Sequence, residues 1–137
     1  MVFGRFWCYN FGMDKTILNR LIKREAYMVW DSLCDIYPAL AFTKCPTISL
    51  NGRLWRVAGL ADQENNSIEL GYKFFKHSKK YAHNMIDVIL PHEIIHIADW
   101  VLFGESDDPM GHGAKWREIM VQYGLKPDAY HTMDIKR

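Results

Sequence analysis

The pentapeptide His92-Glu93-Ile94-Ile95-His96 constrains this chain more than any other feature of it. Two histidines four residues apart lie about 40° apart around an α-helix and one turn along it, so both imidazoles can reach a single zinc ion. Glu93 is rotated by about 100° from His92, close enough to contact a water molecule on the metal without being a ligand. The spacing therefore predicts a helix carrying a metal site, with His92 and His96 as ligands and Glu93 as general base.

A catalytic zinc ion takes three protein ligands and leaves one position to water, so a third ligand must lie elsewhere. Asp99 and Leu102 occupy the third and sixth positions after His96, where a metzincin has Gly and His, and this excludes that class. His112 is the better candidate, because the glycines on both sides of it let the backbone pass close to a metal. Glu118 lies 22 residues beyond His96, a spacing typical of gluzincins, and remains the alternative. For Asp99, we expect a structural or supporting role.

Hydrophobic periodicity and capping residues predict three main helices. The first runs from Lys15 to about Ile36, with Asp14 as its N-cap. The second runs from Asn84 to about Phe103 and contains Pro91, which must either kink it or mark a new first turn. The last lies near Ala114–Tyr123 and ends at a glycine.

Three short runs between the first and second helices predict strands. Thr47–Leu50 and Leu54–Ala58 flank the hairpin-type dipeptide Asn51-Gly52, and Ser67–Tyr72 follows a polar loop. The expected fold class is therefore α+β, with a long N-terminal helix, a small three-stranded antiparallel sheet, a helix carrying the His-Glu-x-x-His motif and a C-terminal helix.

Length and composition place these elements in one domain. The chain has 137 residues, of which 49% are hydrophobic, and its net charge of +1 gives no global reason to bind nucleic acid. Three widely spaced cysteines without a paired motif are typical of a reducing compartment, and no apolar run is long enough to span a membrane. We expect an N-terminal arm over residues 1–13, a core domain over 14–137, and a cytoplasmic location, in the host cytoplasm if the chain is viral.

The order of these motifs resembles the SprT-like zinc metalloprotease domain, which also occurs in Spartan proteases. The similarity rests on His92-Glu93-x-x-His96 followed by His112-Gly113-x-x-Trp116, and extends over roughly residues 14–125. Pro91, and Trp rather than Phe at position 116, are mild departures that remove no ligand. The zinc ribbon common in the family lacks its cysteines here, so the chain looks like the protease core alone.

The resemblance implies a zincin-like fold and a zinc-dependent metallopeptidase that hydrolyses peptide bonds in protein substrates, including proteins associated with DNA. His92, His96 and His112 would hold Zn²⁺, and Glu93 would accept the proton of the attacking water. By analogy with other zincins, the strand Ser67–Tyr72 could offer its edge to an extended substrate. Candidates for stabilising the transition state lie downstream, at Tyr123, Tyr130 and His131.

Two alternatives stay open. Basic and aromatic residues alternate from Tyr72 to Tyr81, which suits either a half-buried helix with solvated lysines, the interpretation we favour, or a DNA contact. The lysines concerned are Lys73, Lys76, Lys79 and Lys80. The second alternative is functional: a catalytically silent, zinc-bearing binding module for DNA or a protein partner. The intact Glu93 argues against it, because a closed structural site needs no carboxylate there. The oligomeric state has no signature in the sequence.

Overall fold

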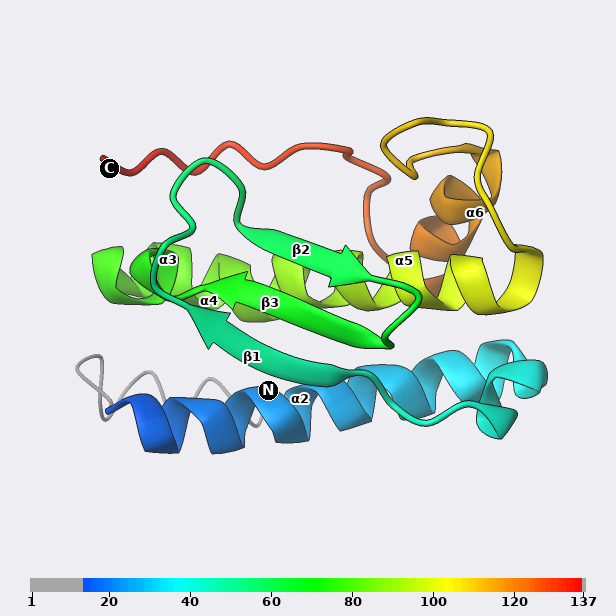
Figure 1. The fold of residues 1–137 in the computed structure, drawn as a ribbon, viewed down its shortest axis with the longest axis horizontal. Helices are drawn as coiled ribbons and strands as arrows, with labels where there is room; N and C mark the ends of the chain where they lie inside the picture. The colour runs from blue at the N-terminus through cyan, green and yellow to red at the C-terminus, as the bar shows by residue number, and fades with distance from the viewer. Residues whose placement is uncertain (1–13, 137) are drawn as a thin grey trace.

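The computed structural model describes residues 14–136, so the predicted N-terminal arm lies outside the described residues (Figure 1). The first helix, α2, spans Lys15–Ile36, as predicted, and Asp14 caps it by accepting a hydrogen bond from the backbone N–H of Ile17 at 2.9 Å. A single 3₁₀ turn, η1 (Pro38–Phe42), follows it. The apolar side of α2 packs on the rest of the core through residues such as Ile22 and Leu33.

The sheet has three strands in the order β1-β3-β2: β1 is Thr47–Asn51, β2 is Gly59–Asp62 and β3 is Ser67–Gly71. β1 pairs with β3 in parallel, whereas β2 pairs with β3 antiparallel. The sheet is therefore mixed, and the predicted antiparallel meander is wrong. β3 lies in the centre with both of its edges paired, and β2 lies at an edge.

The error arises from the packing of the segment after the turn. Asn51 and Gly52 do form a turn, in which the side chain of Asn51 accepts a hydrogen bond from the backbone of Arg53 at 2.8 Å. The chain beyond the turn does not return along β1, because Trp55 and Ala58 pack onto the core and carry it across to the other side of β3. The predicted strand Leu54–Ala58 is thus a connecting segment, and β2 begins one residue after it.

A nearly continuous helical run follows the sheet. It comprises α3 (Tyr72–His77), α4 (Lys79–Asn84), the π-helical turn η2 (Met85–Ile89) and α5 (Leu90–Phe103). Ser78 caps α4, so the predicted start at Asn84 is wrong. Pro91 lies in the first turn of α5, directly after the wider π turn, which accommodates its missing N–H. Phe74 and Phe75 of α3 are buried, as expected for a half-buried helix.

α5 lies behind the sheet and is buried along most of its length, with every residue from Leu90 to Asp99 inside (Figure 1). A loop over residues 104–113 leads to α6 (Ala114–Tyr123), which matches the predicted last helix and ends at Gly124 in the left-handed conformation. The tail, residues 124–136, then returns past β2 (Figure 1). None of the helices in the described part of the chain is long and apolar enough to cross a membrane.

Candidate metal centre

The side chains of three histidines, two from α5 and one from the loop before α6, converge at one point. The Nε2 atoms of His96 and His112 each lie 3.3 Å from Nε2 of His92. One ligand atom from each residue can be chosen so that all three lie within 4.8 Å of one another. A tetrahedral ion with bonds of 2.0–2.1 Å holds its ligands about 3.3–3.4 Å apart, so the distances of His96 and His112 from His92 fit a zinc-sized ion. The structure therefore brings together the three residues predicted as ligands, as a group that could hold a metal ion.

Different elements position the three rings. His92 and His96 are fixed by the burial of α5, with 8% and 7% of their surface exposed. His112 comes from the loop before α6, where the carboxylate of Asp108 accepts a hydrogen bond from its backbone N–H at 2.9 Å. Gly111 lies against His96: a Cβ there would stand 3.2 Å from the ring nitrogen Nδ1, and its φ of +76° favours glycine as well.

Trp116 forms the wall behind the histidines. Its fully buried ring stacks on His96 at 5.2 Å between centroids, and it contacts His92 and His112 edge-to-face at 4.8 and 4.6 Å. This explains the large aromatic residue four positions after His112: it fixes the ring planes so that the Nε2 atoms converge. The indole N–H of Trp116 has no hydrogen-bond partner among the described residues.

Burial keeps the three histidine rings in their neutral form. Burial is the main cause that lowers the pKa of His92 to about 4 and of His96 to about 3, with smaller contributions from neighbouring histidines. The pKa of His112 is lowered for the same main reason. All three rings are therefore neutral at pH 7 and keep lone pairs for a metal. The donor set fits the implied zinc ion.

Glu93 lies beside this group without joining it. Its Oε2 atom is 3.8 Å from Nε2 of His92, and the residue is 8% exposed. Burial raises the pKa of Glu93 to about 8, because the loss of hydration disfavours the charged carboxylate. Gly59 of β2 leaves just enough room for it, since a Cβ at Gly59 would stand 2.8 Å from Cγ of Glu93.

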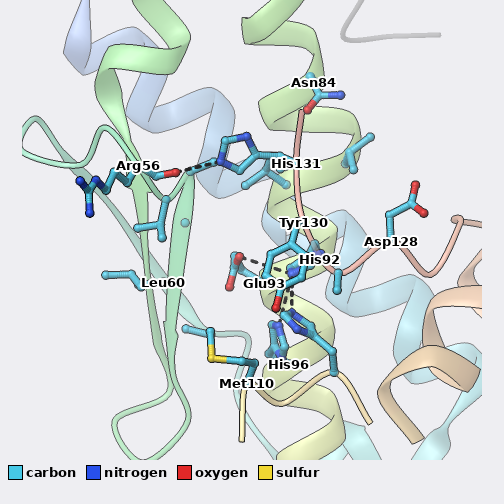
Figure 2. Close-up of a pocket in the computed structure, with 18 of the residues that line it drawn as sticks. Arg56, Leu60, Asn84, His92, Glu93, His96, Met110, Asp128, Tyr130 and His131 are labelled. Carbon is cyan, nitrogen blue, oxygen red and sulfur yellow. Dashed lines mark hydrogen bonds and ion pairs between the residues drawn. The ribbon is translucent and has the colours of Figure 1, made fainter. Parts of the chain in front are cut away.

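The histidines and Glu93 open into a cavity of about 540 Å³ (Figure 2). Its floor is α5 with η2, one wall is the segment Arg56–Ala61, and the opposite wall is the tail segment Asp128–Thr132. Met110 and apolar residues of β2 give the cavity a partly hydrophobic lining. A concave site with convergent polar groups and shifted pKa values is the kind in which catalysis is found.

A family model for the SprT-like family matches residues 32–133, which is well over half of the chain. The chain belongs to the SprT-like family. Similar curated proteins include Protein SprT of Pseudomonas paraeruginosa, 31% identical over 93 residues that cover 67% of this chain and 53% of that protein. Protein SprT of Pseudomonas syringae is 33% identical over 95 residues, covering 69% of this chain and 54% of that protein.

This SprT-like chain thus spans about half the length of the curated relatives it matches. No solved structure gives a significant match to it.

Other predicted residues lie elsewhere. Glu118, the alternative ligand, is on the exposed side of α6, where it pairs loosely with Lys115 at 4.0 Å. Asp99 is buried on α5, which raises its pKa, and it is not part of the histidine group. Tyr123 does not line the cavity, whereas Tyr130 and His131 do.

Sequence reasoning missed two residues that shape this SprT-like site. The first is Asp108, which holds the backbone of His112; the only available signal was a turn-forming aspartate before a proline, which does not point to a ligand. The second is Gly59 as the neighbour of Glu93, because a lone glycine does not reveal what it approaches.

Proposed function

We propose that this SprT-like chain is a zinc-dependent metallopeptidase that hydrolyses peptide bonds in protein substrates, including proteins associated with DNA. The observation that carries the proposal is the placement of a buried carboxylate, Glu93, beside three convergent histidines in one open cavity. His92, His96 and His112 would hold the ion. Zinc bound there would lower the pKa of a water molecule and polarise the carbonyl group of the substrate.

Glu93 would move the protons. Its carboxylate accepts a proton from the attacking water, and the carboxylic acid then delivers that proton to the leaving amine. A nearby cation favours the ionised form of a buried carboxyl group, so metal binding would bring the pKa of Glu93 down from about 8. The burial of Glu93 also keeps bulk water away during the transfer.

The sheet indicates how a substrate would lie. The prediction that the strand Ser67–Tyr72 offers its edge to a substrate is wrong, because this strand is β3 and both of its edges are paired. Among the strands of residues 14–136, β2 lies at an edge of the sheet, and its residues Gly59, Leu60 and Ala61 line the cavity. We therefore infer that an extended segment of a protein substrate adds to β2 by main-chain hydrogen bonds. The binding-module alternative would leave this open cavity and its buried carboxylate without a role, and we do not favour it.

DNA contact remains a proposal. Lys76, Lys79 and Lys80 are exposed on α3 and α4, and Lys73 is half-buried. With Lys136 of the tail, Lys73 and Lys76 line a second, shallower hollow of the surface. Salt-sensitive binding of single-stranded DNA that weakens when these lysines are replaced by alanine would support the contact.

The decisive experiment compares Glu93→Gln with the wild type. Both are loaded with zinc, assayed for metal content, and incubated with an unfolded protein and with a DNA-bound protein, and fragments are followed on a gel. Hydrolysis should fall by about 10²–10⁴-fold in Glu93→Gln while zinc remains bound, because the amide cannot act as a base. Glu118→Gln, on the exposed side of α6, is the matched control and should cleave normally. If the zinc-loaded wild type leaves every substrate intact, the peptidase assignment fails and the binding module takes its place.

A further inference from the structure

The cavity needs a hydrogen-bond donor for the carbonyl oxygen that becomes negative during peptide hydrolysis. The three downstream candidates are now distinguishable by position. Tyr123 is excluded: it does not line the cavity, and burial together with the carboxyl groups of Glu25 and Asp87 raises its pKa. The choice lies between His131 and Tyr130, which are adjacent in the tail.

Both ring nitrogens of His131 are occupied or enclosed. Nε2 lies 3.1 Å from the backbone oxygen of Arg56, and Nδ1 is buried without a partner among the described residues. The ring also packs edge-to-face on Phe74 at 5.4 Å between centroids. His131 therefore ties the tail to the opposite wall of the cavity and has no donor directed at a substrate.

Tyr130 has the opposite character. Its ring lies 5.8 Å from the ring of His112, edge-to-face, while 72% of the residue is exposed. Its hydroxyl group makes no hydrogen bond to any residue of the described chain. The tail is held on both sides of it, by Arg117 bonding the backbone oxygen of Pro127 at 3.2 Å and by the contact of His131 with Arg56. Tyr130 is thus a free phenol on an anchored segment.

The close-up of the cavity supports the same choice (Figure 2). Tyr130 lies over the cluster formed by His92, Glu93 and His96 in that view. Asn84 lies at the end of the cavity away from the histidines, and the side chain of Arg56 points away from them (Figure 2). Of the labelled side chains that can donate a hydrogen bond, Tyr130 is the one that is both free and beside the histidine cluster.

We propose that Tyr130 is a catalytic residue whose hydroxyl group donates a hydrogen bond to the carbonyl oxygen of the scissile peptide bond. This inference rests on the proposed peptidase function. As the water oxygen bonds to the carbonyl carbon, the carbonyl π electrons move onto oxygen and Glu93 takes the water proton. Tyr130 keeps its own proton and holds the oxyanion. When the oxyanion collapses, the C–N bond breaks and Glu93 protonates the leaving amine.

The test uses Tyr130→Phe, which removes only the hydroxyl group, with Tyr27→Phe as a matched control. Tyr27 is 65% exposed on α2 and does not line the cavity. In Tyr130→Phe, kcat should fall roughly 10²-fold with KM within about twofold of wild type and zinc content unchanged. Tyr27→Phe should match the wild type in all three.

A binding experiment makes the test independent of turnover. A phosphonamidate dipeptide presents an anionic oxygen like that of the tetrahedral intermediate, whereas a mercaptoacyl dipeptide of the same sequence binds zinc through sulfur alone. Tyr130→Phe should bind the phosphonamidate at least about tenfold more weakly and the thiol equally well. If both ligands weaken together, or neither does, the assignment of Tyr130 is wrong. If the wild type cleaves no substrate, yet Tyr130→Phe weakens binding of the phosphonamidate alone, the peptidase proposal fails while the donor role of Tyr130 stands.

Discussion

The floor and the tail wall of the cavity are built in opposite ways. The floor is α5, a regular helix buried from Leu90 to Asp99, whose side chains are held by close packing on all sides. The wall is the tail, residues 124–136, an irregular segment held by side-chain contacts such as those of His131 with Arg56 and of Tyr81 with Asp134. The floor carries Glu93 and two of the three histidines that could hold a metal ion, whereas the wall carries Tyr130.

The difference separates two kinds of chemistry. His92 and His96, which would hold the ion, lie on the floor, where close packing restricts their side chains. Tyr130, which would contact a substrate, lies on an irregular segment held by a few side-chain contacts. Replacing a histidine of the group should therefore remove the metal, whereas replacing Glu93 or a residue of the wall should alter turnover with the metal in place.

The largest expected effect tests the metal ligands. His96→Ala and His112→Ala should each weaken zinc binding by more than about 100-fold, because losing a ligand costs more than losing a residue that merely supports one. Metal content after dialysis and competition with a chelator of known affinity measure this. Glu118→Ala is the control and should bind zinc like the wild type, since its side chain is 59% exposed and paired with Lys115. Zinc lost from Glu118→Ala but kept by His112→Ala would move the third ligand onto α6.

A smaller effect concerns the stability of the metal-free floor. The pKa of Glu93 is raised from 4.5 to about 8, so the folded chain binds this proton more tightly than the unfolded chain. Stability contributed by the protonated group is complete below the unfolded value and is lost as pH rises through the folded value. The free energy of unfolding of the wild type should thus fall relative to Glu93→Gln by about 1 kcal/mol from pH 7 to pH 8.5.

Denaturant titrations of both metal-free proteins at the two pH values measure this difference. The buried histidines contribute little here, because they are neutral in both states above about pH 7. Glu118→Gln should track the wild type. Parallel curves for wild type and Glu93→Gln would mean that Glu93 already has a stabilising partner.

The same contrast explains what the sequence could predict. α2, α6 and the ligand pair of α5 follow from local spacing, and the structure places them at the predicted residues. His112 could be proposed because glycines flank it. The sheet topology could not, since the turn at Asn51 forms as expected while the packing of Trp55 and Ala58 decides where the chain goes next.

The tail was beyond local reasoning for a similar reason. The sequence does not distinguish the three candidates for stabilising the transition state, which are Tyr123, Tyr130 and His131, because each has a side chain that can donate a hydrogen bond. Contacts such as that of His131 with Arg56, which are 75 positions apart, hold the tail against the cavity and place Tyr130 in its lining, whereas Tyr123 lies on α6 outside the lining. A contact between such distant residues leaves no periodic or compositional signature.

The smallest expected effect on turnover tests the contact between Gly59 of β2, in the other wall, and Glu93 of the floor. A Cβ at Gly59 would stand 2.8 Å from Cγ and 3.2 Å from Oε2 of Glu93. Cγ is one bond from Cβ, so the clash is relieved only if Glu93 changes its χ1 angle or β2 moves away from α5. Either change displaces the base by a fraction of an ångström, and Gly59→Ala should hydrolyse substrate roughly threefold more slowly with zinc content unchanged.

The matched control is Gly52→Ala, in the turn after β1, where a Cβ would meet nothing within 4 Å. It should keep wild-type turnover and zinc content, so that any loss in Gly59→Ala is assigned to the contact with Glu93 rather than to the removal of a glycine. Loss of zinc from Gly59→Ala would show that β2 also positions the metal ligands, and the division between floor and walls would then be too sharp. Full activity in Gly59→Ala would show instead that Glu93 keeps its position without support from β2, as expected if the packing of α5 alone orients the base.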